Sequence, residues 1–380
     1  MHEHKQNQCK RKVKHRKNVM GLIIFCITVG IAFMFTYYQN LRKEISARQK
    51  WLETVLTGEK RWILENQGSE GEIYMNGSKA GDVNPYFACM AALGLLAETK
   101  NCPITETEKK AVGRYLDWHT GILLETDGKM GIYRKESGKL IYKEKADSED
   151  GYLGMYLFLM GKYLEKTEST DLPEYWKKGI SLALKKIQSL MQDGITQVSE
   201  ENTTVYLMDN LEVWKGLYEL ELAGLEDTQA ISEMRKKIQE QIEKIFWDDA
   251  NQRWRIIGNS DLYHQTEFYP DGVAQIYPLI YEFPVKEKKK QKVLYDQFTE
   301  RFQWQKLKRT GFVWAITGMA AAQMRDIDNL VEFIGNYETE YCKERKYPLY
   351  TGEAGWICIE CEKLYGLYER KIRTAFIPWI

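Results

Sequence analysis

Histidine is scarce in this chain, and the usual histidine-based catalytic patterns are missing. Only five of the 380 residues are histidine, and His119 and His264 are the two that lie beyond residue 15. The sequence has no Ser-His-Asp or Cys-His pattern, no glycine-rich phosphate loop and no metal-ligand spacing. Carboxylates are therefore the side chains that can supply acid and base chemistry, and we expect no cofactor and no metal ion.

Cysteine is also sparse. Of the seven cysteines, Cys9 and Cys26 lie near the start. The other five are sparse and odd in number, which does not fit a disulfide scaffold. Cys358 and Cys361 form a lone CxxC inside an apolar helical pattern, without a second pair or a nearby histidine. We interpret them as buried packing residues rather than as a zinc or redox site.

The chain has no net charge, because 54 lysines and arginines balance 54 aspartates and glutamates. This balance gives no overall attraction for nucleic acid, so we expect no nucleic-acid partner.

The charge is nevertheless unevenly placed at the start of the chain. Residues 2–18 are rich in lysine and arginine and contain one acid, Glu3, whereas residues 19–38 carry no charge. An apolar helix of about 20 residues crosses a bilayer, and a basic flank stays on the cytoplasmic side. Bulky aromatic residues end the run, which favours an uncleaved anchor over a cleaved signal peptide. We predict a cytoplasmic tail at 1–18, a transmembrane signal anchor at 19–38, a polar neck at 39–48 and an extracytoplasmic domain at 49–380, in a single-pass protein of the cell membrane.

Helical periodicity dominates the rest of the chain. The connections after even-numbered helices are short, and those after odd-numbered helices are mostly long. Short connections join antiparallel neighbours, which predicts six helical hairpins whose long loops share one end. The twelve predicted helices are 49–65, 85–98, 105–124, 148–166, 172–192, 209–224, 227–246, 271–283, 286–303, 312–325, 327–343 and 354–372.

The even-numbered helices are more apolar than the odd-numbered ones, as in GYLGMYLFLMGKYL from residue 151 against EMRKKIQEQIEKI from residue 233. An apolar set inside a charged set indicates two concentric rings. The predicted fold class is therefore all-α, an (α/α)6 toroid of six helical hairpins. Brief extended pieces at 131–133, 139–143 and 253–257 predict small hairpins within the loops.

Two acidic motifs stand at corresponding places, Ser69-Glu70-Gly71 ahead of the first inner helix and Asp147-Ser148-Glu149-Asp150 at the start of the next. With the six-hairpin pattern over about residues 50–372, the chain resembles the six-hairpin glycosidases, and most closely the family 8 glycoside hydrolases. That family places its proton donor in a Ser-Glu-Gly loop and opens the next inner helix with acids. The resemblance implies that Glu70 is the proton donor and that Asp150 or Asp147 activates water.

The remaining long loops also end in polar and aromatic residues at the start of an inner helix. Asp209 and Glu212 lie three apart, which fits either contact with a substrate or a helix capping box. His264 is more typical of an exposed loop residue than of a catalytic one. Because aromatic rings stack on pyranose faces and polar groups bond to hydroxyls, we assign substrate binding to Glu72, Tyr152, Asp209, Glu212, Tyr269, Asp271, Gln275 and Trp356.

Together these features predict a membrane-anchored, extracytoplasmic glycoside hydrolase that cleaves an envelope or extracellular polysaccharide by carboxylate acid/base catalysis. Its expected partners are a poly- or oligosaccharide and the membrane. The alternative is a catalytically inactive toroid that binds glycans in envelope or exopolysaccharide assembly. An isoprenoid cyclase on a similar scaffold fits less well, because the loops are rich in Asn, Gln, Ser and Tyr.

Overall fold

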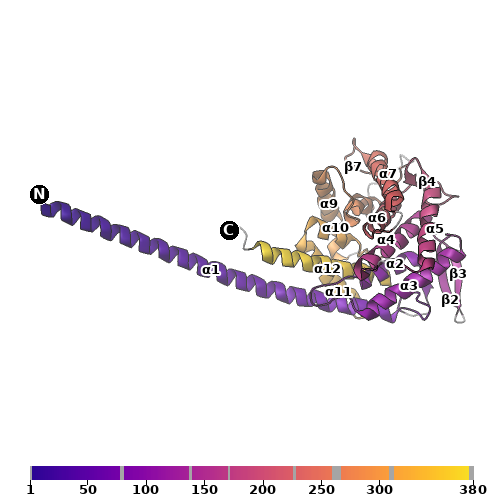
Figure 1. Ribbon diagram of the computed structural model, residues 1–380, viewed down its shortest axis with the longest axis horizontal. Coiled ribbons are helices and arrows are strands. Elements are labelled where there is room, and N and C mark those ends of the chain that lie inside the picture. The colour runs from indigo at the N-terminus through magenta and orange to yellow at the C-terminus, as the bar shows by residue number, and fades with distance from the viewer. Residues whose placement is uncertain are drawn as a thin grey trace. The chain divides into compact units, whose positions relative to one another are not determined.

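The computed structural model describes residues 2–77, 81–136, 139–169, 172–225, 228–258, 267–307 and 312–375, with side chains from residue 20 onward except at 22 and 24. The chain divides into two compact units, residues 1–51 with 368–380 and residues 52–367, and each is considered by itself. Helices make up most of both (Figure 1).

Twelve α-helices occur in the described residues, each near a predicted position. They are α1 (His2–Glu65), α2 (Pro85–Leu95), α3 (Glu106–Glu125), α4 (Glu149–Thr167), α5 (Glu174–Leu190), α6 (Leu207–Leu222), α7 (Thr228–Phe246), α8 (Val273–Ile280), α9 (Lys288–Phe302), α10 (Thr317–Met324), α11 (Ile327–Tyr341) and α12 (Thr351–Thr374).

The first helix is longer than predicted. α1 continues without a break through the predicted neck at 39–48, because the sequence QNLRKEISAR has no proline or glycine to end a helix. Apolar side chains between Met20 and Tyr37 are widely exposed, and Phe33 is 76% exposed.

No helix, over the residues that were described, has the length and apolarity of a membrane span. The predicted anchor at 19–38 includes Val19, Leu22 and Ile24, whose side chains lie outside the described part of the chain. The anchor therefore stays a prediction.

The six even-numbered helices form a closed inner ring. α2 packs against α4, α4 against α6, α6 against α8, and α8 against α10. Gly318 of α10 faces Glu360 of α12, and Gly355 of α12 packs against Gly94 of α2, which closes the ring. Outer helices α3, α7, α9 and α11 each pack on an inner neighbour. The predicted helical toroid is confirmed.

The inner and outer helices differ in how many of their residues are buried. In α4, every residue from Glu149 to Gly161 is buried. In the outer helix α7, the buried residues are Ile231, Ile238, Ile242 and Phe246, which lie on one face at spacings of seven and four. This is the contrast in apolarity that the sequence predicts.

The loops contain short strands and turns. The predicted hairpin is present as β2 (Gly131–Glu136) and β3 (Lys139–Lys145), and β1 (Asp82–Val83) joins it in an antiparallel sheet. Two further two-stranded ladders are β4 (Met191–Gln192) with β5 (Ile195–Thr196), and β6 (Trp247–Asp248) with β7 (Arg253–Trp254). A π-helical turn, η1 (Phe268–Gly272), precedes α8, and a 3-10 turn, η2 (Trp304–Lys306), follows α9.

Several helix starts differ from the prediction by two or more residues, and those of α6 and α10 have an identifiable cause. α6 begins at Leu207 instead of 209, because the backbone N–H of Leu207 donates to Ile256 and fixes the turn earlier. The capping-box interpretation of Asp209 and Glu212 is therefore wrong, since both lie inside the helix. α10 begins at Thr317 instead of 312, because Trp314 adopts a left-handed backbone with φ of 60°.

Glycines let α4 and α6 pack backbone to backbone. A Cβ atom at Gly216 would lie 2.3 Å from the carbonyl oxygen of Gly154. We expect Gly216→Ala to lower the free energy of unfolding by about 1–3 kcal/mol, because two helices must separate to admit the methyl group. Chemical denaturation measures the effect. Gly366→Ala in α12 is the matched control, since nothing lies within 4 Å of its added Cβ, and this change should be neutral or stabilising. Equal effects of the two changes would contradict the close packing.

Candidate active site

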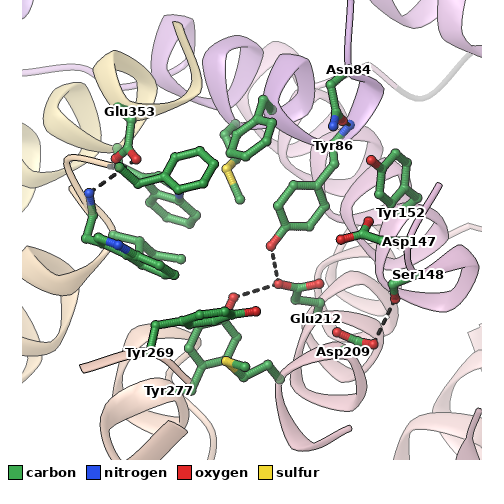
Figure 2. Close-up of a pocket in the computed structure, with 17 residues that line it drawn as sticks. Asn84, Tyr86, Asp147, Ser148, Tyr152, Asp209, Glu212, Tyr269, Tyr277 and Glu353 are labelled. Carbon is green, nitrogen blue, oxygen red and sulfur yellow. Dashed lines mark hydrogen bonds between the residues drawn. The ribbon is translucent and has the colours of Figure 1, made fainter. Parts of the chain in front are cut away.

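The starts of the six inner helices meet at one cavity of about 400 Å³. Figure 2 shows its side chains converging from several helices. The long loops therefore share one end, as the loop pattern predicts. The lining residues are Asn84, Tyr86, Phe87, Met90, Asp147, Ser148, Tyr152, Met208, Asp209, Glu212, Tyr269, Tyr277, Phe312, Trp314, Ile316, Glu353 and Trp356.

Glu212 is a buried carboxyl held by tyrosines. Its Oε1 atom accepts hydrogen bonds from the hydroxyls of Tyr86 and, at 2.7 Å, Tyr277 (Figure 2). The hydroxyl of Tyr281 donates to the same atom at 3.3 Å. Burial raises the pKa of Glu212 to about 8, although the tyrosine hydrogen bonds oppose the shift. The carboxyl is therefore mostly protonated at neutral pH.

The other oxygen of Glu212, Oε2, lies beside Gly151 at the start of α4. A Cβ atom at Gly151 would come within 2.8 Å of this oxygen. No described residue makes a hydrogen bond to Oε2, so one oxygen is fixed by tyrosines and the other is available to a ligand. Glycine at position 151 keeps that side of the carboxyl open.

A second pair of acids is joined by one serine. The hydroxyl of Ser148, the N-cap residue of α4, lies 2.8 Å from Asp150 Oδ1 and 2.8 Å from Asp209 Oδ2. Asp209 lines the cavity, whereas Asp150 is fully buried behind it. Burial raises the pKa of Asp150 to about 6. Burial and the nearby carboxyls of Asp150 and Glu212 raise the pKa of Asp209 well above its usual range.

Asp147 is the exposed carboxylate of the cavity. It directly precedes Ser148, and its side chain points into the cavity close to Tyr152 (Figure 2). Because it is exposed, Asp147 has access to the water that a hydrolytic reaction consumes.

Aromatic rings form the opposite wall of the cavity. Phe87 stacks on Phe312 with ring centres 5.5 Å apart, and Tyr269 lies 4.7 Å from Trp314. Glu353 supports this wall, because it accepts hydrogen bonds from the backbone N–H groups of Trp314 and Ala315 at 3.2 and 2.6 Å. Burial raises the pKa of Glu353 to about 7.

Among the residues that the structure describes, the cavity lining contains no lysine, arginine or histidine. Its ionisable groups are four carboxyls and four tyrosines, and no described ion pair neutralises any of the four carboxyls. The chemistry that this arrangement supports is proton transfer by carboxyl groups, with hydroxyl and ring contacts to position a polar ligand.

Six of the predicted site residues line the cavity: Asp147, Tyr152, Asp209, Glu212, Tyr269 and Trp356. Asp150 lies directly behind them through Ser148. The structure therefore brings together most of the acids that the loops were expected to deliver.

Two predicted acids of the first loop lie elsewhere. Glu70 is exposed and does not line the cavity. Glu72 is fully buried away from the cavity, where it accepts hydrogen bonds from Tyr74 and the backbone of Glu70 and pairs with Lys135 at 3.3 Å. Glu72 thus ties its loop to β2, and these contacts account for it structurally.

The fourth loop contributes less than predicted. Gln275 does not line the cavity, because its side chain is hydrogen-bonded to the backbone of Trp254 at both ends of the amide. Asp271 is buried outside the cavity lining, and its carboxylate oxygens have no hydrogen-bond partner among the described residues. His264 lies outside the described residues.

The tyrosines around Glu212 are not among the predicted site residues. Tyr277 on α8 and Tyr281 directly after its end lie four apart, so the sequence predicts that they share a face. The sequence does not reveal that their partner is Glu212 on α6, because no sequence pattern pairs residues of different hairpins. Tyr86, Ser148, Phe312 and Trp314 were missed for the same reason.

The raised carboxyl pKa values make stability depend on pH. Glu212 keeps its proton in the folded protein up to about pH 8, whereas in the unfolded chain its pKa returns to the ordinary glutamate value of 4.5. Its contribution is fully present below about pH 4.5 and is lost as pH rises to about 8. We expect Glu212→Gln to reduce this fall in unfolding free energy by an amount on the order of 3 kcal/mol.

Denaturant titrations of both proteins between pH 5 and 8 measure the difference. Exposed Glu70→Gln is the control and should leave the slope unchanged. A Glu212→Gln protein with the same pH slope as the parent would contradict a protonated Glu212.

Comparison with known proteins supports the fold. No family model and no curated protein matches the sequence. Similar solved structures include a glycosidase variant in complex with glucose, with a TM-score of 0.57 and 11% identity, covering 86% of this chain and 98% of that one. A sugar epimerase from a ruminal bacterium has a TM-score of 0.53 and 10% identity, covering 83% and 98% of the two chains. A D-mannose isomerase has a TM-score of 0.54 and 11% identity, covering 83% and 97%. The resemblance to six-hairpin glycosidases is therefore confirmed for the fold.

Proposed function

We propose that the chain is a glycoside hydrolase in which Glu212 is the general acid. The observation that carries this proposal is the setting of Glu212: a buried carboxyl with one oxygen held by three tyrosines and the other facing the cavity. Burial also raises its pKa to about 8, which favours the protonated form. Cleavage of a glycosidic bond needs such a proton donor next to a second, ionised carboxylate. Asp147 supplies the second group, because it is exposed within the same cavity.

The reaction follows from these positions. Glu212 donates its proton to the leaving glycosidic oxygen, and the tyrosine hydroxyls stabilise the charge that remains on the carboxylate. Asp147 takes a proton from the attacking water. Asp209 lines the same cavity and binds a sugar hydroxyl.

A carbohydrate substrate suits the lining of the cavity. The rings of Phe87, Phe312 and Trp314 offer flat apolar faces opposite the acids, which is how proteins hold pyranose rings. Glycosidases and sugar isomerases share the fold, which also favours a sugar.

We also propose that residues 19–38 anchor the protein in the cell membrane, with the domain outside the cytoplasm. The uncharged run, its basic flank and the exposed apolar side chains of α1 support this. The substrate is then an envelope or extracellular polysaccharide.

The catalytic role of Glu212 is testable through the leaving group. We expect Glu212→Gln to lower kcat by roughly 100-fold or more on oligosaccharides, whose leaving oxygen needs a proton. The loss should be much smaller on dinitrophenyl glycosides, whose leaving group departs without protonation. A panel of polysaccharides and aryl glycosides is first screened with the parent protein to find a substrate. Release of reducing ends then measures the rate on oligosaccharides, and release of dinitrophenol measures the rate on dinitrophenyl glycosides.

Glu70→Gln is the matched control and should retain full activity, because this residue is exposed outside the cavity. Equal losses on both kinds of substrate would argue against proton donation by Glu212. Glycan binding by the parent protein without any turnover would favour the inactive glycan-binding alternative.

The anchor is tested by fractionation. We expect the full-length chain to remain in membranes after carbonate washing, and a chain without residues 1–38 to be released, because the apolar run is then missing. Immunoblotting of the two fractions measures this. Release of the full-length chain by carbonate would overturn the anchor.

A further inference from the structure

A chain of hydrogen-bonding groups runs inward from Asp209. Asp209 Oδ2 lies 2.8 Å from the Ser148 hydroxyl, which lies 2.8 Å from Asp150 Oδ1. Asp150 Oδ2 lies 2.7 Å from the hydroxyl of Thr196, which is 2.9 Å from Asn210 Oδ1. Asp150, Thr196 and Asn210 are fully buried, so water cannot replace the contacts among these three residues.

At the inner end of this hydrogen-bond chain, the directions of donation are fixed by Asn210. The amide nitrogen of Asn210 donates to the backbone oxygens of Thr196 and Tyr206, both at 2.9 Å. Asn210 Oδ1 accepts the backbone N–H of Thr196 at 2.8 Å. The amide is therefore held with its oxygen towards the Thr196 hydroxyl, and that hydroxyl must donate to it.

Counting protons then sets the state of both aspartates. A hydroxyl carries one proton, so Thr196 has none left for Asp150, and Asp150 must donate to Thr196. Ser148 donates to Asp150 in the same way and accepts from Asp209. The four contacts are satisfied together when Asp150 and Asp209 each carry a proton. Burial of the pair favours the same state.

We propose that Ser148, Asp150, Thr196 and Asn210 hold Asp209 in its protonated form, so that Asp209 presents its Oδ1 atom to the substrate as a neutral hydrogen-bond acceptor. Thr196 and Asn210 are then positioning residues, since they act on the cavity through Asp150 and Ser148. The role of Asp209 towards a substrate rests on the proposed hydrolase function. The protonation of Asp209 does not, because the hydrogen-bond chain alone implies it.

Protonation of Asp209 also matters for its neighbours. The titratable groups that face it are Asp147 and Asp150 at the start of α4, Glu212 on α6 and Tyr269 ahead of α8. A charge on Asp209 would oppose ionisation of Glu212, which the proposed acid must undergo when it releases its proton. A neutral Asp209 avoids that opposition.

Removing the Thr196 hydroxyl tests the proposal. In Thr196→Val, Asp150 loses its acceptor and turns its proton towards Ser148, so that Ser148 donates to Asp209 and Asp209 becomes ionised. Thr196→Ser keeps the hydroxyl and should behave as the parent. Thr120→Val is the matched control, because Thr120 is equally buried but bonds to Tyr156 instead.

Infrared spectroscopy of the full-length protein with 13C-labelled aspartate, at about pH 5, reports which aspartates are protonated, because ordinary aspartates are ionised there. Asp209 is identified as the band lost when each protein also carries Asp209→Asn. We expect the band in the parent, Thr196→Ser and Thr120→Val, and its loss in Thr196→Val. An ionised Asp209 in the parent protein, or an unchanged band in Thr196→Val, would overturn the proposal, and the parent measurement decides even if Thr196→Val does not fold.

The pH dependence of kcat gives a second readout. With Asp209 ionised, the alkaline limb that reports Glu212 should move up by about one pH unit in Thr196→Val and stay in place in Thr196→Ser. If the protein has no hydrolase activity, the infrared result still stands, so failure of the function and failure of the hydrogen-bond chain are distinguishable.

Discussion

Close contact between inner helices is the constraint on which the rest of the molecule depends. Where α4 meets α6, and where α12 meets α2, glycine lets the two backbones touch without side chains between them. The order of short and long connections places the first turns of these inner helices at the same end of the ring. The acids and tyrosines of that end then share one cavity although they come from different hairpins.

The architecture was predictable because it follows from local sequence patterns. Helical periodicity gives the helices, and the alternation of long and short loops gives the hairpins and their common end. The contrast between an apolar α4 and an amphipathic α7 separates the inner ring from the outer one. The start at Leu207 was not predictable because a contact with a distant loop sets it. The start at Thr317 was not predictable because it follows the left-handed backbone of Trp314, which no sequence pattern shows.

The site was predictable in its residue types more than in its roles. Asp147, Asp209 and Glu212 stand out as acids at the starts of inner helices, and all three line the cavity. Motif likeness alone selected Glu70, which lies on the surface. Glu212 differs from it because tyrosines from two other hairpins surround it, and no pattern along the chain reveals contacts between hairpins.

The described part of the cavity lining carries no basic side chain, and this has a consequence for recognition. In the proposed reaction, the sugar ring gains positive charge as the glycosidic bond breaks, and the described lining offers carboxyl oxygens and no cation beside it. The described lining also has no cation to pair with the negative charge of uronic acids, phosphorylated sugars or sulfated glycans. For the proposed hydrolase, a small ring compound carrying a protonated nitrogen in place of the anomeric carbon would imitate the developing charge.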